Sequence, residues 1–228
     1  SALATSINSF FQQVTADLAL LSIDPPTLPS VFPFEFVISK AAVERKLMQI
    51  KIHKAPGPDN LPNWVLRDFC MQLSGPVCAI FNASIREGFV PTRWKEANVI
   101  PVPKVQPPKS VESDLRPISL TATLGKLLES FVGGWILGRI VDKLDDHQYG
   151  GLKRRSTTHA LVDMLHHWHS AADRGQSARV VFIDFAKAFD HVDHNILVAK
   201  LLAYDLPDVI IRWMMSFLSD RRQRVKIG

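Results

Sequence analysis

The feature that most restricts what this chain can fold into is an apolar run that ends in an aspartate. Residues 180–183, Val-Val-Phe-Ile, precede Asp184 without a polar interruption. Such a run predicts a β-strand over residues 179–185 that is buried on both faces, as in the centre of a sheet. A carboxylate at the end of a buried strand costs free energy unless a cation or hydrogen bonds compensate its charge.

Two further aspartates, Asp190 and Asp193, follow Asp184 closely. Carboxylate oxygens are ligands that Mg2+ prefers, together with substrate phosphates. Two such ions about 4 Å apart can activate a hydroxyl nucleophile and stabilise a leaving pyrophosphate. An aspartate at the end of a strand can also cap the turn that follows. The spacing alone leaves both interpretations of Asp184 open, a metal ligand and a cap.

Length and composition are those of a globular chain. Of the 228 residues, 46% are apolar, which is enough for the core of one large domain or of two lobes. No apolar run reaches the length of about 18 residues that a membrane span needs. The chain begins with serine and lacks the basic-then-apolar order of a signal peptide. We therefore expect a cut from a longer intracellular protein, nuclear or cytoplasmic and not secreted.

The net charge of +5, from 27 basic and 22 acidic residues, favours an acidic partner only modestly. The positions of the basic residues are more informative. Lys153, Arg154 and Arg155 form one cluster, and Arg221 and Arg222 begin another. These clusters are interpreted either as solvated loops or as contacts with a nucleic-acid phosphate backbone, and the second is our hypothesis.

Hydrophobic periodicity and turn signals predict a helix-rich chain with a few strands. Residues 1–38 contain several prolines and are expected to form an arm or linker. Helices are predicted at 39–52 with Ser39 as N-cap, 62–73, 77–88 ending at Gly88, 123–144, 157–173, 193–204 and 207–219, and strands at 97–102, 115–120, 179–185 and 224–227. This order of elements indicates the α+β class rather than a regular βαβ array.

Three helical segments carry more specific expectations. The pair Gly133 and Gly134 costs roughly 2 kcal/mol relative to alanine in an exposed helix, so we expect close packing or a kink there. The helix that begins near Pro62 is expected to bury Val65, Phe69 and Leu73. The two cysteines, Cys70 and Cys78, are expected on neighbouring helices as small buried hydrophobic residues.

Histidines gather in two places. Four lie in the helix predicted over 157–173, and two flank Asp193; they are His159, His166, His167, His169, His191 and His194. Histidines one turn apart on a helix can bind zinc, and a zinc-dependent hydrolase is one alternative function, which would require stoichiometric zinc. However, the apolar stripe through Leu161, Leu165 and Trp168 leaves most of these histidines on the opposite face. A solvated or nucleic-acid-facing surface is therefore favoured over a zinc site.

The run from Phe182 to Val192 resembles the first palm motif of reverse transcriptases from non-LTR (LINE-like) retrotransposons. Further blocks that resemble this family occur in the family's order: Lys54-Ala55-Pro56-Gly57-Pro58-Asp59, Trp94 to Lys104, Asp114 to Leu120 with Gly125, Lys126 and Glu129, Gln148 to Gly150 with Ser156 to Thr158, and Trp213 to Arg222. The resemblance covers residues 40–228. It implies an incomplete right-hand polymerase, with fingers and part of a palm, helix-rich around a small antiparallel sheet. The implied division is an arm at 1–38, fingers with the start of the palm helices at 39–178, and a partial palm at 179–228.

The resemblance also implies roles for individual residues. Asp184 is implied as the ligand shared by two Mg2+ ions, with the main-chain carbonyl of Phe185 on the same side. Phe189 matches the ring that blocks a ribose 2′-hydroxyl; taken alone it would be interpreted as a core aromatic residue. Arg116 matches the fingers arginine that contacts the incoming triphosphate, where its planar fork suits phosphate oxygens. Lys104 is a looser match to the fingers lysine with the same task, and a solvated loop lysine is the alternative.

The implied protein is an RNA-directed DNA polymerase that extends a DNA primer on an RNA template with dNTPs and Mg2+, without a membrane partner. The family's later Tyr/Phe-x-Asp-Asp turn does not occur in this sequence. We therefore expect only half of the two-ion site and no polymerisation by this chain alone, with Asp190 orienting the turn or Lys187. The alternative is a decayed or co-opted fragment that binds nucleic acid without catalysis. The oligomeric state stays open.

Overall fold

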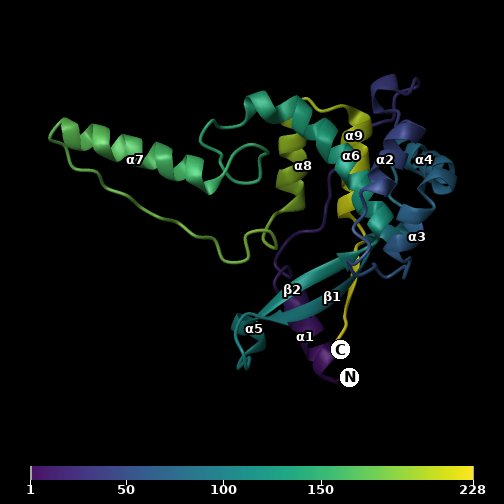
Figure 1. Ribbon diagram of the computed structural model, residues 1–228, viewed down its shortest axis with the longest axis horizontal. Coiled ribbons are helices and arrows are strands. Elements are labelled where there is room, and N and C mark those ends of the chain that lie inside the picture. Colours follow the sequence, from purple (N-terminus) through teal and green to yellow (C-terminus); the bar gives the residue numbers. More distant parts are fainter. Residues whose placement is uncertain (1, 228) are drawn as a thin grey trace. The chain divides into compact units, whose positions relative to one another are not determined.

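The computed structural model, which describes residues 2–227, has the α+β class predicted from the sequence: about half of these residues are helical, and three strands form one mixed sheet. The chain divides into two compact units (Figure 1). The first contains the residues up to Leu137 and those from Phe189 on, and the second is Gly138–Ala188. The division into arm, fingers and partial palm stays a prediction.

The first unit contains most of the helices and the whole sheet. Its helices are α1 (Ala2–Gln13), α2 (Lys40–Met48), α3 (Asn63–Asp68), α4 (Cys70–Glu87), α5 (Val111–Asp114), α6 (Thr123–Ile140, which crosses into the second unit), α8 (His194–Ala203) and α9 (Asp208–Leu218). Its strands are β1 (Glu96–Pro103), β2 (Leu115–Thr121) and β3 (Arg222–Val225). Single turns of 3-10 helix occur at Phe34–Phe36 and Thr92–Lys95. No helix among residues 2–227 is long and apolar enough to cross a membrane.

Helices begin and end at residues whose side chains or backbone freedom allow it. The Ser39 hydroxyl accepts a hydrogen bond from the Ala42 amide at 3.2 Å, so the predicted N-cap of α2 is confirmed. Asp193 accepts from the amides of Asn195 and Ile196 and caps α8 in the same way. At the end of α4, Gly88 has a φ of 60°, the left-handed conformation that glycine adopts without a Cβ penalty, and this predicted end is also confirmed.

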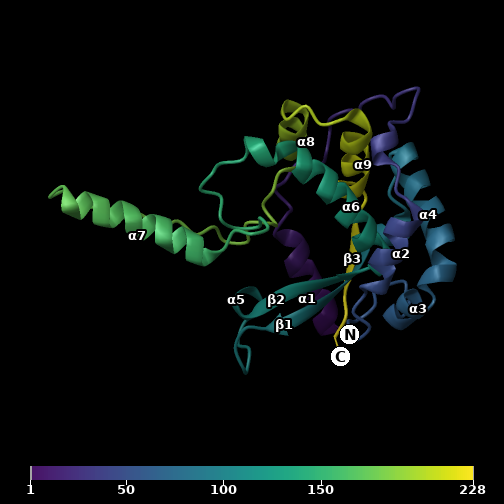
Figure 2. The same ribbon diagram turned by 45° about the horizontal axis from the view of Figure 1, so that its top comes forward.

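The sheet has the strand order β2-β1-β3 (Figure 2). β1 and β2 form the predicted antiparallel hairpin, with Val99 opposite Ser119. β3 pairs with β1 in parallel, with Ala97 opposite Gln223, so the expectation of an antiparallel sheet is wrong. The reason is the connection: parallel strands need a long crossover, and the chain between β2 and β3 supplies one that ends in α9.

The core of the first unit lies where α2, α3, α4, α6 and α9 meet, and its largest fully buried side chains include Phe36, Leu47, Phe81, Leu128 and Trp213. Trp213 on α9 is buried and its indole N–H donates to the Ser84 hydroxyl on α4 at 3.0 Å. This bond satisfies the one polar group of a large apolar ring. The packing of α9 on α4 therefore places the end of α9, and with it the start of β3.

Some side chains lie elsewhere than their periodicity indicated. Phe69 is 47% exposed because α3 ends at Asp68 and α4 begins at Cys70, so the helical register does not continue through it. Leu66 and Cys70 occupy the core instead. Both cysteines lie on α4 rather than on neighbouring helices; Cys70 is buried, Cys78 is half-buried, and both are free thiols.

The pair Gly133 and Gly134 lies inside an unbroken α6. A Cβ at either position would meet no atom within 4 Å among the described residues outside the adjoining backbone of α6. Close packing at this pair is therefore not found, the alternative of a kink stays a prediction, and α6 carries the cost of two glycines on an open face.

The N-terminal segment contains a helix, α1, that the sequence patterns did not predict. Ile7 on α1 is buried, and α1 lies beside the sheet in both views (Figures 1 and 2). A cavity of about 280 Å³ remains between α1 and the outer part of the hairpin, with Leu3 and Leu115 among its lining residues. The stretch after α1 is irregular, and its Leu20 carbonyl and Ser22 amide are hydrogen-bonded to the Asn195 side chain.

The second unit consists of the end of α6, a 3-10 turn at Val141–Lys143, a loop, helix α7 (Thr157–Asp173) and a long irregular segment. The apolar stripe of α7 is not buried: Leu161 is 52% and Leu165 is 45% exposed. The strand predicted over 179–185 is also absent, and Phe182 is 81% exposed. A strand needs a hydrogen-bonded neighbour, and no strand of residues 2–227 pairs with this segment, so its backbone stays solvated.

One glycine holds a contact that no other residue can make. A Cβ on Gly57, in the loop before α3, would lie 2.5 Å from the backbone of Thr121 and Ala122. We expect Gly57→Ala to lower the free energy of unfolding by about 1–3 kcal/mol, because the loop and the end of β2 must separate. Gly133→Ala is the matched control and should raise it by about 0.5–1 kcal/mol. Urea unfolding midpoints measure both, and equal midpoints for the two variants would contradict this account.

Candidate functional site

The two residues predicted to contact the triphosphate lie together at the outer end of the β1–β2 hairpin. Arg116 is paired with Val102 in the sheet register, and Lys104 follows the last residue of β1. The Lys104 amide donates to the Asp114 carbonyl at 2.7 Å, which continues the pairing past the strands. Both side chains are exposed. Residues twelve positions apart in sequence thus form one cationic end of the hairpin.

Asp114 organises the turn that joins these two residues. Its carboxylate accepts hydrogen bonds from the amide of Lys109 at 2.8 Å, the amide of Ser110 at 3.1 Å and the hydroxyl of Ser113 at 2.8 Å. These donors, the Lys109 amide above all, hold the pKa of Asp114 below its usual range. The Lys104 ammonium in turn donates to the Ser113 carbonyl at 2.7 Å. The sequence predicted the cations but not this carboxylate, whose signal is the serine N-cap four residues before it.

The predicted metal ligands lie in the irregular part of the second unit. Asp184 and Phe185 are exposed, and no hydrogen bond or ion pair of the Asp184 side chain occurs within residues 2–227. The cap interpretation of Asp184 is therefore not seen, whereas Asp193 does act as a cap. Phe189 belongs to the first unit and is 95% exposed in the turn before α8, so it is not a core aromatic residue.

The basic cluster of the second unit contains two kinds of residue. Lys153 and Arg154 are exposed loop residues, as an interface with phosphates requires. Arg155 instead donates from one guanidinium nitrogen to the carbonyls of Asp145, Asp146 and Gln148, the shortest at 2.7 Å. Arg155 therefore fixes the loop that precedes α7.

The basic cluster of the first unit lies at the end of α9. Arg222 is exposed at the start of β3. The Arg221 guanidinium lies 4.5 Å from the centre of the Phe217 ring and donates to the Phe217 carbonyl. Nearby Lys95 is buried, with its ammonium 5.3 Å from the centre of the Phe89 ring. Burial lowers the pKa of Lys95, with Asp220 opposing that shift and Arg221 adding to it. Lys95 is the least accessible cation of this group. No sequence pattern indicated that it is buried.

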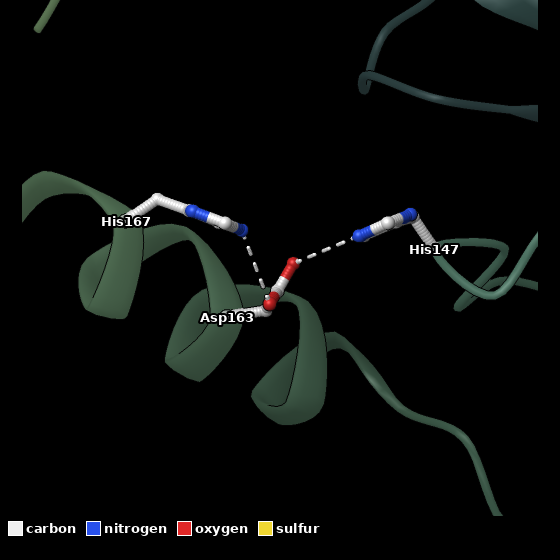
Figure 3. Close-up of side chains that lie close together, drawn as sticks. All are labelled: His147, Asp163 and His167. Carbon is white, nitrogen blue, oxygen red and sulfur yellow. Dashed lines mark ion pairs between the residues drawn. The ribbon is translucent and has the colours of Figure 1, made fainter.

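The described residues contain one group of three side chains placed to hold a metal ion, and it does not include Asp184. The group consists of His147, Asp163 and His167 in the second unit (Figure 3). Only His167 belonged to the histidines noted in the sequence. His147 lies in a loop, so no helical spacing could connect it with the other two.

Comparison with known proteins places the chain in a family. Residues 102–227 match the reverse transcriptase (RNA-dependent DNA polymerase) family, and this stretch includes Lys104, Arg116, Asp184 and Phe189. Because the match covers more than half of the chain, the protein belongs to the reverse transcriptase family.

The relatives narrow this to one group. A probable RNA-directed DNA polymerase from transposon BS of Drosophila melanogaster is 29% identical over 222 residues, covering 95% of this chain and 24% of the relative. The polymerase from mobile element jockey of the same species is 28% identical over 203 residues, covering 86% and 22%, and that from transposon X-element is 27% identical over 212 residues. The chain thus spans about a quarter of the length of these relatives. The predicted relation to non-LTR retrotransposon polymerases is confirmed.

The role of Asp114 can be tested by Asp114→Ala, with the exposed Glu112→Ala as control. Hydrogen exchange of the Lys109 and Ser110 amides should accelerate in the first variant only, because their acceptor is lost. The stability of the turn that Asp114 holds should also depend on pH. The folded pKa of Asp114 is depressed, so its stabilising bonds are complete above the ordinary carboxyl pKa and are lost as pH falls through the folded value. Unchanged exchange in Asp114→Ala would contradict the role.

Proposed function

We propose that this chain is the fingers and first palm portion of an RNA-directed DNA polymerase that extends a DNA primer on an RNA template with dNTPs. The observation that supports this most strongly is the family match over residues 102–227, which spans every residue assigned here to nucleotide or metal. The polymerases with this activity in their names are about four times longer than the chain. We therefore propose the catalytic activity for a longer protein, of which this chain forms one part.

In this proposal, Lys104 and Arg116 bind the triphosphate of the incoming nucleotide. Both lie at the exposed end of one hairpin, so their positive charges can face one ligand together. The guanidinium of Arg116 offers two parallel N–H donors to phosphate oxygens, whereas the ammonium of Lys104 acts as a point charge. One of the three N–H donors of the Lys104 ammonium is bonded to the Ser113 carbonyl, which leaves the other two for phosphate oxygens.

Asp184 is proposed as a ligand of Mg2+, with the carbonyl of Phe185 beside it. Its exposed carboxylate, with no competing bond within residues 2–227, fits the oxygen-donor chemistry of Mg2+. When bound, the two ions of such a site activate the primer 3′-hydroxyl and stabilise the leaving pyrophosphate. Among the described residues, Asp184 belongs to no group of three side chains that could hold a metal ion. We therefore assign at most half of the ligands of the two-ion site to these residues.

The second candidate is a nucleic-acid-binding fragment without catalysis. The observation that favours it is the pair of exposed cations, Lys153 and Arg154, in the unit where Asp184 has no grouped carboxylate partners. Binding of this kind is independent of sequence and weakens steeply as salt increases. It predicts retention of primed template without extension.

The catalytic role can be tested in a chimaera in which residues 40–228 replace the matching part of the jockey polymerase. With Mg2+, the chimaera should extend a DNA primer on an RNA template. Asp184→Ala should lower the extension rate about 100-fold or more, because a group that stabilises charge in the transition state is lost. The control is Asp173→Ala, an exposed aspartate at the end of α7 in the same unit that should leave the rate unchanged. Extension that survives Asp184→Ala refutes the role, and salt-sensitive binding without any extension supports the second candidate.

The proposed sugar discrimination predicts a separate result in the same chimaera. Phe189→Ala should increase ribonucleotide incorporation relative to deoxynucleotide by roughly 10-fold or more, because discrimination by shape is worth on the order of 1–3 kcal/mol. Phe189→Tyr keeps the ring and should keep the discrimination. The ratio of kcat/KM for dNTP and rNTP measures it. A ratio that is the same in Phe189→Ala as in the parent chimaera would remove Phe189 from this role.

A further inference from the structure

The side chains of His147, Asp163 and His167 converge from two elements of the second unit (Figure 3). Asp163 and His167 lie one turn apart on α7, and His147 reaches them from the loop that follows the 3-10 turn. One oxygen of Asp163 lies 3.6 Å from Nε2 of His167, and the other lies 4.0 Å from Nε2 of His147. One ligand atom from each residue can be chosen so that all three lie within 4.8 Å of one another.

These separations are close to those of a tetrahedral zinc site. With zinc–ligand bonds of about 2.0–2.1 Å, neighbouring ligand atoms of a tetrahedron lie roughly 3.4 Å apart. The separations of 3.6 and 4.0 Å run to different oxygens of Asp163, whereas the three atoms of a site with one Asp163 oxygen lie within 4.8 Å of one another, which exceeds that value by less than one bond length. His147 and His167 are about two-thirds exposed, so their rings can rotate to close the remaining gap without a core rearrangement.

A second carboxylate orients His147 for such a role. Asp145 accepts hydrogen bonds from the His147 amide at 2.7 Å and lies 3.1 Å from Nδ1 of the same ring. A proton held on Nδ1 by this carboxylate leaves the lone pair of Nε2 toward Asp163. A histidine that donates one ring N–H to a carboxylate while its other nitrogen faces the metal is the usual second-layer arrangement around zinc.

The loop that presents His147 is itself fixed. The Arg155 guanidinium donates to the carbonyls of Asp145, Asp146 and Gln148, on both sides of His147. His147 therefore faces Asp163 from a loop whose carbonyls are held on both sides of it.

The second unit has a physical reason to use a metal ion. No hydrophobic side chain of the described core lies within Gly138–Ala188, so this unit has no buried apolar centre of its own. Small units that lack a sufficient core are commonly stabilised by disulfides or by a structural metal. Both cysteines lie in the first unit, which leaves a metal as the cross-link that the side chains of the second unit can provide.

We propose that His147, Asp163 and His167 bind one zinc ion that fastens the loop to the middle of α7. The ligands would be Nε2 of each histidine and one Asp163 oxygen, and the fourth position would hold water. Two imidazoles favour zinc or its neighbours in the first transition series over Mg2+. The site is therefore chemically distinct from the proposed Mg2+ ligand Asp184, and it does not depend on the proposed polymerase activity.

The test uses the full chain without a polyhistidine tag, titrated with zinc and separately with Co2+. We expect one equivalent of zinc per chain by calorimetry and metal analysis, a tetrahedral Co2+ spectrum, and no displacement by excess Mg2+. His147→Ala should weaken zinc binding at least 10-fold, and Asp145→Asn should weaken it by about 10- to 100-fold, the effect of losing a second-layer partner. His169→Ala is the matched control, an exposed histidine on α7 outside the group, and should bind as the parent does.

Hydrogen exchange provides the structural readout. Zinc should slow exchange in the loop around His147 and in the first half of α7, in the parent chain and in His169→Ala but not in His147→Ala. Circular dichroism of all variants without metal should coincide, because the substituted side chains are exposed. Absence of zinc binding by the parent, equal binding by His147→Ala, or equal weakening by His169→Ala would each overturn the proposal.

Discussion

The first unit depends on the position of β1 between one strand that is near it in the sequence and one that is distant. β2 follows β1 after a loop that contains α5, whereas β3 arrives only after α6, the second unit, α8 and α9. Closing so long a loop costs entropy that the four-residue β3 cannot compensate by itself. Burial of Trp213 and its bond to Ser84 hold α9 on α4, and α9 delivers β3 to the edge of β1. The helical core and the parallel pair thus stabilise each other.

Sequence patterns predicted the elements that local signals determine. The cap at Ser39 and the end at Gly88 depend on residues within one turn, the β1–β2 hairpin joins neighbouring segments, and the C-terminal strand was predicted at 224–227 and found at Arg222–Val225. The direction of β3 was not predictable, because a short strand has the same alternation in either orientation. The strand predicted from the apolar run before Asp184 is absent for a different reason. An apolar pattern indicates that a segment can be buried, but not whether a partner strand is available.

The same division holds for the candidate sites. The resemblance to a known family identified Lys104 and Arg116, and the structure shows them at one end of one hairpin. The resemblance did not show the turn held by Asp114, because that turn depends on backbone amides and its one sequence signal is Ser110, four residues before Asp114. The histidine helix was read correctly as an exposed surface, yet the group at Asp163 escaped notice because His147 approaches it from a loop. Contacts between elements, rather than within them, are what sequence patterns omit.

The extent of β3 has a mechanical consequence for the hairpin. β3 pairs with β1 only over Glu96–Val99, so the hairpin beyond Val99 is a two-stranded ribbon. Backbone held by one neighbour deforms at lower free energy than backbone held by two. The inner end is fixed further by the contact of Gly57. The part of the hairpin beyond Val99 should therefore bend at lower free energy than the part that β3 holds. Lys104 and Arg116 both lie beyond Val99, so bending there would move the two cations together and leave the helical core unchanged.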